Sequence, residues 1–117
     1  GAWHSELIRG AEAEFTECLA AASFQKPQAH IVLNVTAETA EKPEELRAVM
    51  ARQLCSPVRW YDSMGRMRDA GVALFVEVGP GRVLTGIQRK VLPKDHPAQI
   101  CNVGSLAQLE EFLKRPA

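Results

Sequence analysis

The sequence has no long hydrophobic run, no excess of one charge and few aromatic residues. Its 117 residues contain 14 Lys and Arg against 14 Asp and Glu, so the formal net charge is zero. A protein without a basic surface stripe is not expected to bind the phosphate backbone of a nucleic acid. No apolar stretch approaches the roughly 20 residues that cross a bilayer, and no secretory signal is visible in these residues. We therefore expect a cytoplasmic protein with neither nucleic acid nor a membrane as a partner.

Cysteines are also few. Cys18, Cys55 and Cys101 form an odd, widely spaced set without a CxxC pair. This pattern favours reduced, mostly buried thiols over a disulfide or a metal site. No metal is expected.

What is present is ordinary globular composition, with 46% hydrophobic and 24% charged residues. Apolar residues at helical spacing predict helices over five segments: 5–22, 43–54, 58–70, 82–91 and a last one that begins at Ser105. Short β-favouring apolar runs predict three strands: 31–35, 72–78 and 100–103. The helix at Ser105 has a capping-box partner in Gln108, and Gly71 supplies a left-handed helix stop.

The alternation of helices and strands predicts the fold class. Apolar strands separated by helices indicate an α/β, three-layer arrangement with a short parallel sheet of about three strands. We treat residues 1–117 as one piece without linkers. Because so narrow a sheet leaves two edges unpaired, we expect the chain to be part of something larger.

The segment Gly79-Pro80-Gly81 joins a predicted strand to a predicted helix, where free backbone N–H groups can cradle a phosphate. The spacing of its glycines matches neither a Walker loop nor a dinucleotide fingerprint. A tight turn with close helix–strand packing is the favoured interpretation.

Three histidines and one asparagine are candidates for chemistry. His30 and His96 lie in polar, proline-flanked loops and are expected to be solvated, whereas His4 precedes the first helix on a turn that could face a cleft. Asn34 ends a predicted strand, where α/β proteins place ligand-binding groups. No serine elbow and no carboxylate completes a triad with His4, so spacing alone assembles no catalytic site.

Four sequence blocks, taken together, resemble one family. In their order and spacing they are similar to the C-terminal part of malonyl-CoA:acyl-carrier-protein transacylase. The blocks are Gly1-Ala2-Trp3-His4-Ser5, Asn34-Val35-Thr36-Ala37, Arg52-Gln53-Leu54-Cys55-Ser56-Pro57-Val58-Arg59-Trp60 and Glu77-Val78-Gly79-Pro80-Gly81-Arg82-Val83-Leu84-Thr85-Gly86. They extend over nearly the whole chain.

The resemblance implies a reaction and its residues. The family transfers malonyl from coenzyme A to the thiol of acyl carrier protein through a serine-bound intermediate, in fatty acid biosynthesis. It implies that His4 is the general base, that the backbone carbonyl of Gln53 orients it, and that Trp3 and Asn34 contact substrate. Trp3 stands where the family usually has phenylalanine, and its ring should favour malonyl over a branched acyl group.

The resemblance also implies what this chain lacks. The family's nucleophilic serine, its malonyl-binding arginine and its oxyanion-hole glutamine all precede the matched part. We therefore expect an N-terminal portion as a partner, an inactive chain without it, and no cofactor beyond malonyl-CoA and phosphopantetheine as substrates. The implied fold is the C-terminal part of an α/β-hydrolase-like large subdomain.

Two alternatives stay open. The chain could be a fragment of a polyketide synthase acyltransferase domain, which shares the histidine motif, or a non-catalytic module that binds carrier protein. Neutral charge speaks mildly against the module, because carrier proteins are acidic and prefer basic surfaces. A receiver-like signalling domain is excluded, because no Asp ends a predicted strand.

Overall fold

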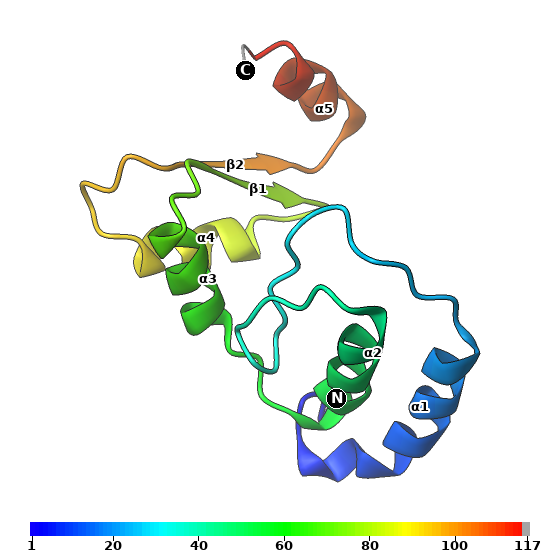
Figure 1. Ribbon diagram of the computed structural model, residues 1–117. Helices are drawn as coiled ribbons and strands as arrows, with labels where there is room; N and C mark the ends of the chain where they lie inside the picture. Colours follow the sequence, from blue (N-terminus) through cyan, green and yellow to red (C-terminus); the bar gives the residue numbers. More distant parts are fainter. Residues whose placement is uncertain (116–117) are drawn as a thin grey trace. The chain divides into compact units, whose positions relative to one another are not determined.

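The computed structural model describes residues 1–115 and divides into two compact units, Gly1–Ser63 and a second that begins at Met64. Figure 1 shows the elements along the chain. The first unit contains η1 (Glu6–Ala11), α1 (Glu12–Ala21), α2 (Pro43–Arg52) and η2 (Gln53–Cys55). The boundary falls within α3 (Trp60–Asp69), and the second unit continues with β1 (Leu74–Val78), α4 (Val83–Val91), β2 (Gln99–Val103) and α5 (Leu106–Leu113).

The first predicted helix is divided in two. A 3₁₀ segment, η1, precedes α1, and Ile8 has non-helical angles (φ −110°, ψ 17°). Beyond this kink α1 packs against α2, and Leu19 and Leu46 are their buried residues. The Arg47 guanidinium lies 5.1 Å from the centre of the Phe24 ring beside this pair.

The strand predicted over 31–35 was wrong. Only Val32 pairs, in an isolated antiparallel bridge to Thr39. The chain reverses immediately, because Ala37 takes a left-handed conformation (φ 58°) and its N–H donates to the Leu33 carbonyl at 2.8 Å. The apolar run has strand composition, but its neighbouring residues form a turn that takes up the backbone pairing.

Within its described residues, 64–115, the second unit holds a parallel sheet of two strands, not three. β1 and β2 pair in register from Leu74↔Gln99 to Val78↔Val103. In Figure 1 the sheet lies between α4 and α5, and both helices contact it. The α/β class and the strands predicted near 72–78 and 100–103 are confirmed within about two residues, but the sheet is narrower than expected.

Two helix ends follow their sequence signals. Ser105 Oγ accepts from the Gln108 N–H at 3.3 Å, as the capping box predicts, while Gln108 Oε1 accepts from the Gly104 N–H at 2.7 Å. Gly71 has a φ of 80° and its N–H donates to the Arg68 carbonyl at 2.9 Å, closing α3. Within residues 1–115, no helix has the length and hydrophobicity needed to span a membrane.

Candidate functional site

The candidate site is built around His4 in the first unit. His4 is exposed, and its Nδ1 lies 2.9 Å from the backbone oxygen of Gln53, 49 positions along the chain. The turn that carries it is pinned by Ser5, whose Oγ donates to the Ala2 carbonyl at 2.6 Å. The histidine backbone itself is left-handed, with a φ of 61°.

The hydrogen bond fixes the tautomer of a neutral His4 ring. A backbone carbonyl oxygen only accepts, so Nδ1 must carry the proton and donate a hydrogen bond to the Gln53 oxygen. Nε2 is then left with its lone pair, which can accept a proton from another group. The arrangement is an imidazole oriented by a neutral carbonyl, and such a ring can act chemically as a base.

The Gln53 carbonyl is available because of where helix α2 ends. Gln53 is the C-cap of α2 and the first residue of η2, so it lies where the i to i−4 pairing of the α-helix stops. Carbonyls at a helix C-terminus lack α-helical donors and carry the negative end of the dipole. Pro57 follows shortly and has no backbone N–H to offer.

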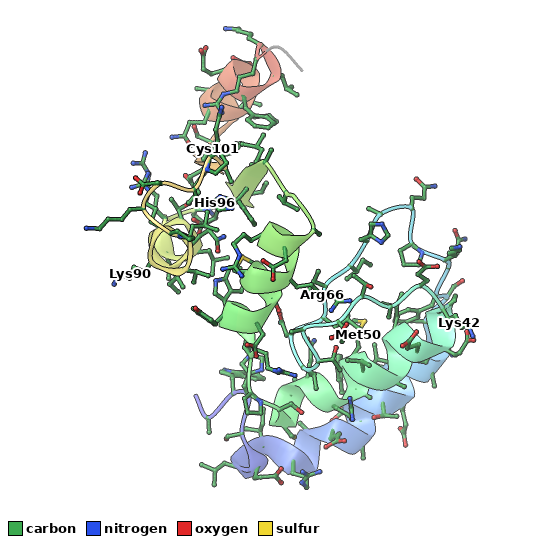
Figure 2. All side chains as sticks on the ribbon, turned by 60° about the vertical axis from the view of Figure 1, so that its left-hand side comes forward. Lys42, Met50, Arg66, Lys90, His96 and Cys101 are labelled. Carbon is green, nitrogen blue, oxygen red and sulfur yellow. The ribbon has the colours of Figure 1, made fainter. Side chains whose placement is uncertain are left out.

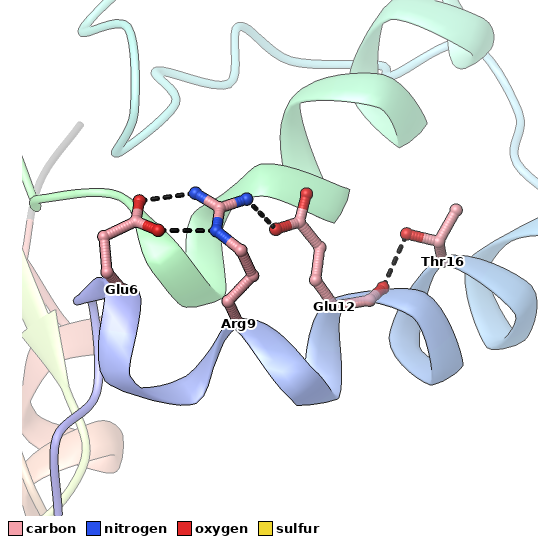
Figure 3. Close-up of polar contacts among 4 residues, drawn as sticks. All are labelled: Glu6, Arg9, Glu12 and Thr16. Carbon is pink, nitrogen blue, oxygen red and sulfur yellow. Dashed lines mark hydrogen bonds and ion pairs between the residues drawn. The ribbon is translucent and has the colours of Figure 1, made fainter.

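Charged side chains connect the segment after His4 to α1. Figure 3 shows Arg9 paired with Glu6 and, at 3.1 Å, with Glu12, whose carbonyl also accepts from Thr16 Oγ1 at 2.7 Å. The hydrogen bond from Arg9 lowers the pKa of Glu6, and the same contact raises the pKa of Arg9. The Glu6 carboxylate is therefore held ionised beside Arg9.

Cys55 lies against this charged group. It is 8% exposed at the end of η2, and burial, followed by the influence of the Glu12 side chain, raises the pKa of its thiol. A buried thiol with a raised pKa is a weak nucleophile. Cys55 is therefore a packing group, not a reactive one.

All three cysteines are free, although the expectation that they are mostly buried was right only for Cys55. Cys18 is exposed and Cys101 is half-buried. Among residues 1–115, no group of three or more His, Cys, Asp or Glu side chains could hold a metal ion.

Trp3 and Asn34 are both exposed. Trp3 has 66% of its surface accessible and its indole lies beside Gly1. The Asn34 carbonyl accepts from the Arg59 N–H at 2.8 Å, and the Arg59 guanidinium donates to the Thr36 carbonyl at 3.0 Å and to Asp62 at 2.8 Å. Arg59 therefore clamps the turn that carries Asn34. Sequence reasoning missed this role, because its acceptors are mostly backbone oxygens.

The other histidines differ from each other. His30 is exposed, as expected. His96, labelled in Figure 2, is half-buried and its Nδ1 accepts from the Ala98 N–H at 3.2 Å. Its ring is used to close a loop, so the expectation of a solvated side chain was wrong there.

The glycine-rich turn carries its own anion. The Glu77 carboxylate accepts from the backbone N–H groups of Leu84 and Thr85, at 3.1 and 2.7 Å. The Thr85 side chain and the two backbone N–H groups lower the pKa of Glu77. The N-terminus of α4 is therefore occupied by a side chain of the protein, which supports a turn rather than a phosphate cradle.

Comparison with known proteins identifies relatives, although no family model matches the chain. It is 31% identical over 110 residues to malonyl CoA-acyl carrier protein transacylase from Haemophilus influenzae, covering 94% of this chain and 35% of that protein. It is 37% identical over 94 residues to polyketide biosynthesis protein ThaF from Burkholderia thailandensis, covering 80% of this chain but 8% of that protein.

Solved structures of transacylases are also similar to this chain. MCAT from Streptococcus pneumoniae matches with a TM-score of 0.86 and 34% identity, over 97% of this chain and 36% of that one. A malonyl-transacylase solved in complex with its type II PKS acyl-carrier protein matches with a TM-score of 0.86 and 30% identity, over 96% of this chain and 35% of that one. The chain thus spans about a third of the length of these transacylases.

Proposed function

Because the chain is homologous to the C-terminal part of malonyl CoA-acyl carrier protein transacylases, we propose that it supplies the general base of a malonyl transfer. The donor is malonyl-CoA and the acceptor is the phosphopantetheine thiol of acyl carrier protein, in cytoplasmic fatty acid biosynthesis. The observation that carries the proposal is the 2.9 Å contact between His4 Nδ1 and the Gln53 carbonyl.

In this reaction His4 acts through Nε2. A serine from the remaining portion of the enzyme attacks the malonyl thioester carbonyl, and Nε2 accepts its proton as the C–O bond forms. The C–S bond then breaks and the imidazolium returns the proton to the departing coenzyme A thiolate. The second half of the reaction runs these steps in reverse with the carrier thiol: the thiol attacks the malonyl-serine ester as Nε2 accepts its proton, and the proton returns to the serine oxygen as the C–O bond breaks. General-base assistance of this kind contributes roughly 10²–10⁴-fold.

The neutral carbonyl partner suits a base that must both take and return a proton. The Gln53 oxygen keeps the ring in one tautomer and attracts the imidazolium by its dipole. It has no proton equilibrium of its own at working pH. No metal or other cofactor is needed by this scheme.

Substrate contacts are assigned to Trp3 and Asn34. The exposed indole of Trp3, directly before the base, would limit the space for an α-methyl group on the acyl chain. The Asn34 amide, on the turn clamped by Arg59, would offer hydrogen bonds to substrate. The two-stranded sheet is expected to continue into strands of the N-terminal portion, within an α/β-hydrolase-like subdomain.

The test compares two histidine variants in the enzyme that contains this chain together with its N-terminal portion. We expect His4→Ala to slow serine acylation by malonyl-CoA at least about 100-fold, because the proton acceptor is lost. His30→Ala removes another exposed imidazole of the same unit and should leave the rate within about threefold. Acylation by His4→Ala at the wild-type rate would end the assignment. The chain without its N-terminal portion should not transfer malonyl.

A second candidate is an acyltransferase of polyketide biosynthesis. The 37% identity to ThaF, a polyketide biosynthesis protein, favours it. Competition between a fatty-acid carrier protein and a polyketide carrier protein for the malonyl-enzyme separates the two pathways. Binding of either carrier without any transfer would instead indicate a non-catalytic interaction module.

A further inference from the structure

The hydroxyl of Ser5 is directed to the turn that precedes η1. Ser5 is the N-cap residue of η1, and a serine in this position commonly accepts a hydrogen bond from the first turn of its helix. Among the described residues, its side chain makes no such capping bond. Its Oγ instead donates to the Ala2 carbonyl at 2.6 Å, three positions back in the chain. The hydroxyl therefore serves the turn and not the helix.

That turn, residues 2–5, holds His4 in a conformation that it would not adopt by itself. The His4 backbone is left-handed, with a φ of 61°, which glycine adopts freely but a residue with a Cβ avoids. The hydrogen bond from Ser5 to Ala2 spans His4 directly. The Ser5 carbonyl also accepts from the Ile8 N–H at 3.3 Å. Ser5 therefore closes the turn around His4 and ties it to η1.

The conformation of the turn determines where the imidazole lies. His4 Nδ1 is 2.9 Å from the Gln53 carbonyl oxygen in η2, and η1 and η2 are in contact. If the His4 backbone relaxed to a negative φ, the side chain would leave in a different direction and the ring would lose this acceptor. A neutral imidazole without the acceptor can carry its proton on either nitrogen. With the proton on Nε2, that atom has no lone pair and cannot act as a base.

We propose that Ser5 is a positioning residue for the base. Its hydrogen bond to Ala2 holds His4 in the left-handed conformation and so keeps the ring on the Gln53 carbonyl, with the proton on Nδ1. Ser5 acts through the backbone of the turn and not on the reacting atoms. The inference rests on the proposed function for its kinetic readout, whereas the tautomer of the ring can be observed without turnover.

Three variants of Ser5, made in the complete enzyme, separate the hydroxyl from the shape of the side chain. Ser5→Ala removes the donor, and Ser5→Val removes it while keeping the branched shape of threonine. Ser5→Thr retains the donor, and the extended backbone of Ser5 (φ −141°, ψ 164°) suits a β-branched residue. Thr16→Ala is the matched control, because Thr16 Oγ1 also donates to a backbone carbonyl, that of Glu12 at 2.7 Å (Figure 3).

Two readouts are taken for each variant. Spectra of ¹⁵N-labelled histidine report the fraction of neutral His4 rings that are protonated on Nδ1, and the signals are assigned by their loss in His4→Ala. Single-turnover kinetics give the maximal rate of serine acylation and the malonyl-CoA concentration at half of that rate. In Ser5→Ala and Ser5→Val we expect the Nδ1–H fraction and the maximal rate to fall together, by about fivefold, with the half-maximal concentration unchanged. Ser5→Thr and Thr16→Ala should remain within about twofold of wild type in both readouts.

The outcomes that overturn the proposal are distinct from failure of the proposed function. A wild-type Nδ1–H fraction in Ser5→Ala and Ser5→Val would overturn it, even if acylation were slower, because Ser5 would then have only a structural role. Ser5→Thr as impaired as Ser5→Val would overturn it too, since the hydroxyl would not be the group that matters. If Ser5→Ala fails to fold by circular dichroism, the comparison of Ser5→Thr with Ser5→Val decides. If His4→Ala keeps full activity, the proposed function fails, while the tautomer still decides whether Ser5 positions the ring.

Discussion

At the scale of single residues, His4 is held in a conformation that most side chains avoid. A φ of 61° places it in the left-handed region, at a cost of about 1–2 kcal/mol for a residue with a Cβ. The hydrogen bonds from Ser5 Oγ to Ala2 and from His4 Nδ1 to Gln53 keep it there. Strained backbone of this kind is often found at functional sites, which agrees with a base presented on a turn.

The backbone nature of the Gln53 contact gives the first prediction. Gln53→Ala keeps the carbonyl oxygen that accepts the hydrogen bond from His4 Nδ1, so serine acylation should slow far less than in His4→Ala, by about threefold or less against about 100-fold. Single-turnover acylation rates of the two variants provide the measurement. Equal losses would mean that the Gln53 side chain, not its main chain, serves the reaction.

The backbone nature of this contact also explains why the spacing of residues in the sequence could not identify the partner of His4. His4 is recognisable as a candidate from its place before a helix, but its partner is a carbonyl, which every residue has. Gln53 was therefore found only through family resemblance. The Arg59 clamp was missed for the same reason, because its acceptors include the backbone oxygens of Asn34 and Thr36.

At the scale of elements, the Glu77 cap of α4 should depend on pH. Its pKa is lowered in the folded protein, so the unfolded chain binds more protons as pH falls from about 4.5. The stabilisation from Glu77 is thus fully present above that pH and is lost on further acidification. Urea unfolding at several pH values should show Glu77→Gln less stable than wild type at pH 7, with the difference shrinking below pH 4.5.

Two glycines of the second unit should respond oppositely to alanine. A Cβ on Gly104 would stand 2.9 Å from the Gly79 carbonyl oxygen, whereas Gly86, inside α4, has open space around it. We expect Gly104→Ala to destabilise by about 1–3 kcal/mol. Gly86→Ala should stabilise by about 0.5–1 kcal/mol through helix propensity. Denaturant midpoints of both variants check this, and a stabilised Gly104→Ala would contradict the close approach.

Helix positions were predictable because their signals are local. Ser105 with Gln108, and Gly71 at the end of α3, act through neighbouring residues and appear as expected. The strand prediction for residues 31–35 was wrong because an apolar pattern indicates that a segment could form a strand, but not which strand it would pair with. Ala37 turns the chain back in a left-handed conformation, but alanine is not a residue type that signals such a turn.

At the scale of the whole molecule, the second unit exposes an apolar groove. A hollow of about 380 Å³ lies between the sheet and α5, and Val78 beside it is 80% exposed. Apolar surface of this kind marks a face that another segment or molecule covers. With a two-stranded sheet and a chain about a third as long as its relatives, this groove is where we expect the N-terminal portion to pack.

The groove yields a last prediction for the chain without that portion. A hollow of this size accommodates a small aromatic dye such as anilinonaphthalene sulfonate. Replacing Val78 and Leu106 together by serine should lower dye fluorescence at least about twofold, because both side chains line the groove. Leu7→Ser, at an equally exposed leucine of the first unit, is the matched control and should leave the fluorescence unchanged. Adding the N-terminal portion should displace the dye from the wild-type chain, and dye that stays bound in the reassembled enzyme would show that this groove is not the surface it covers.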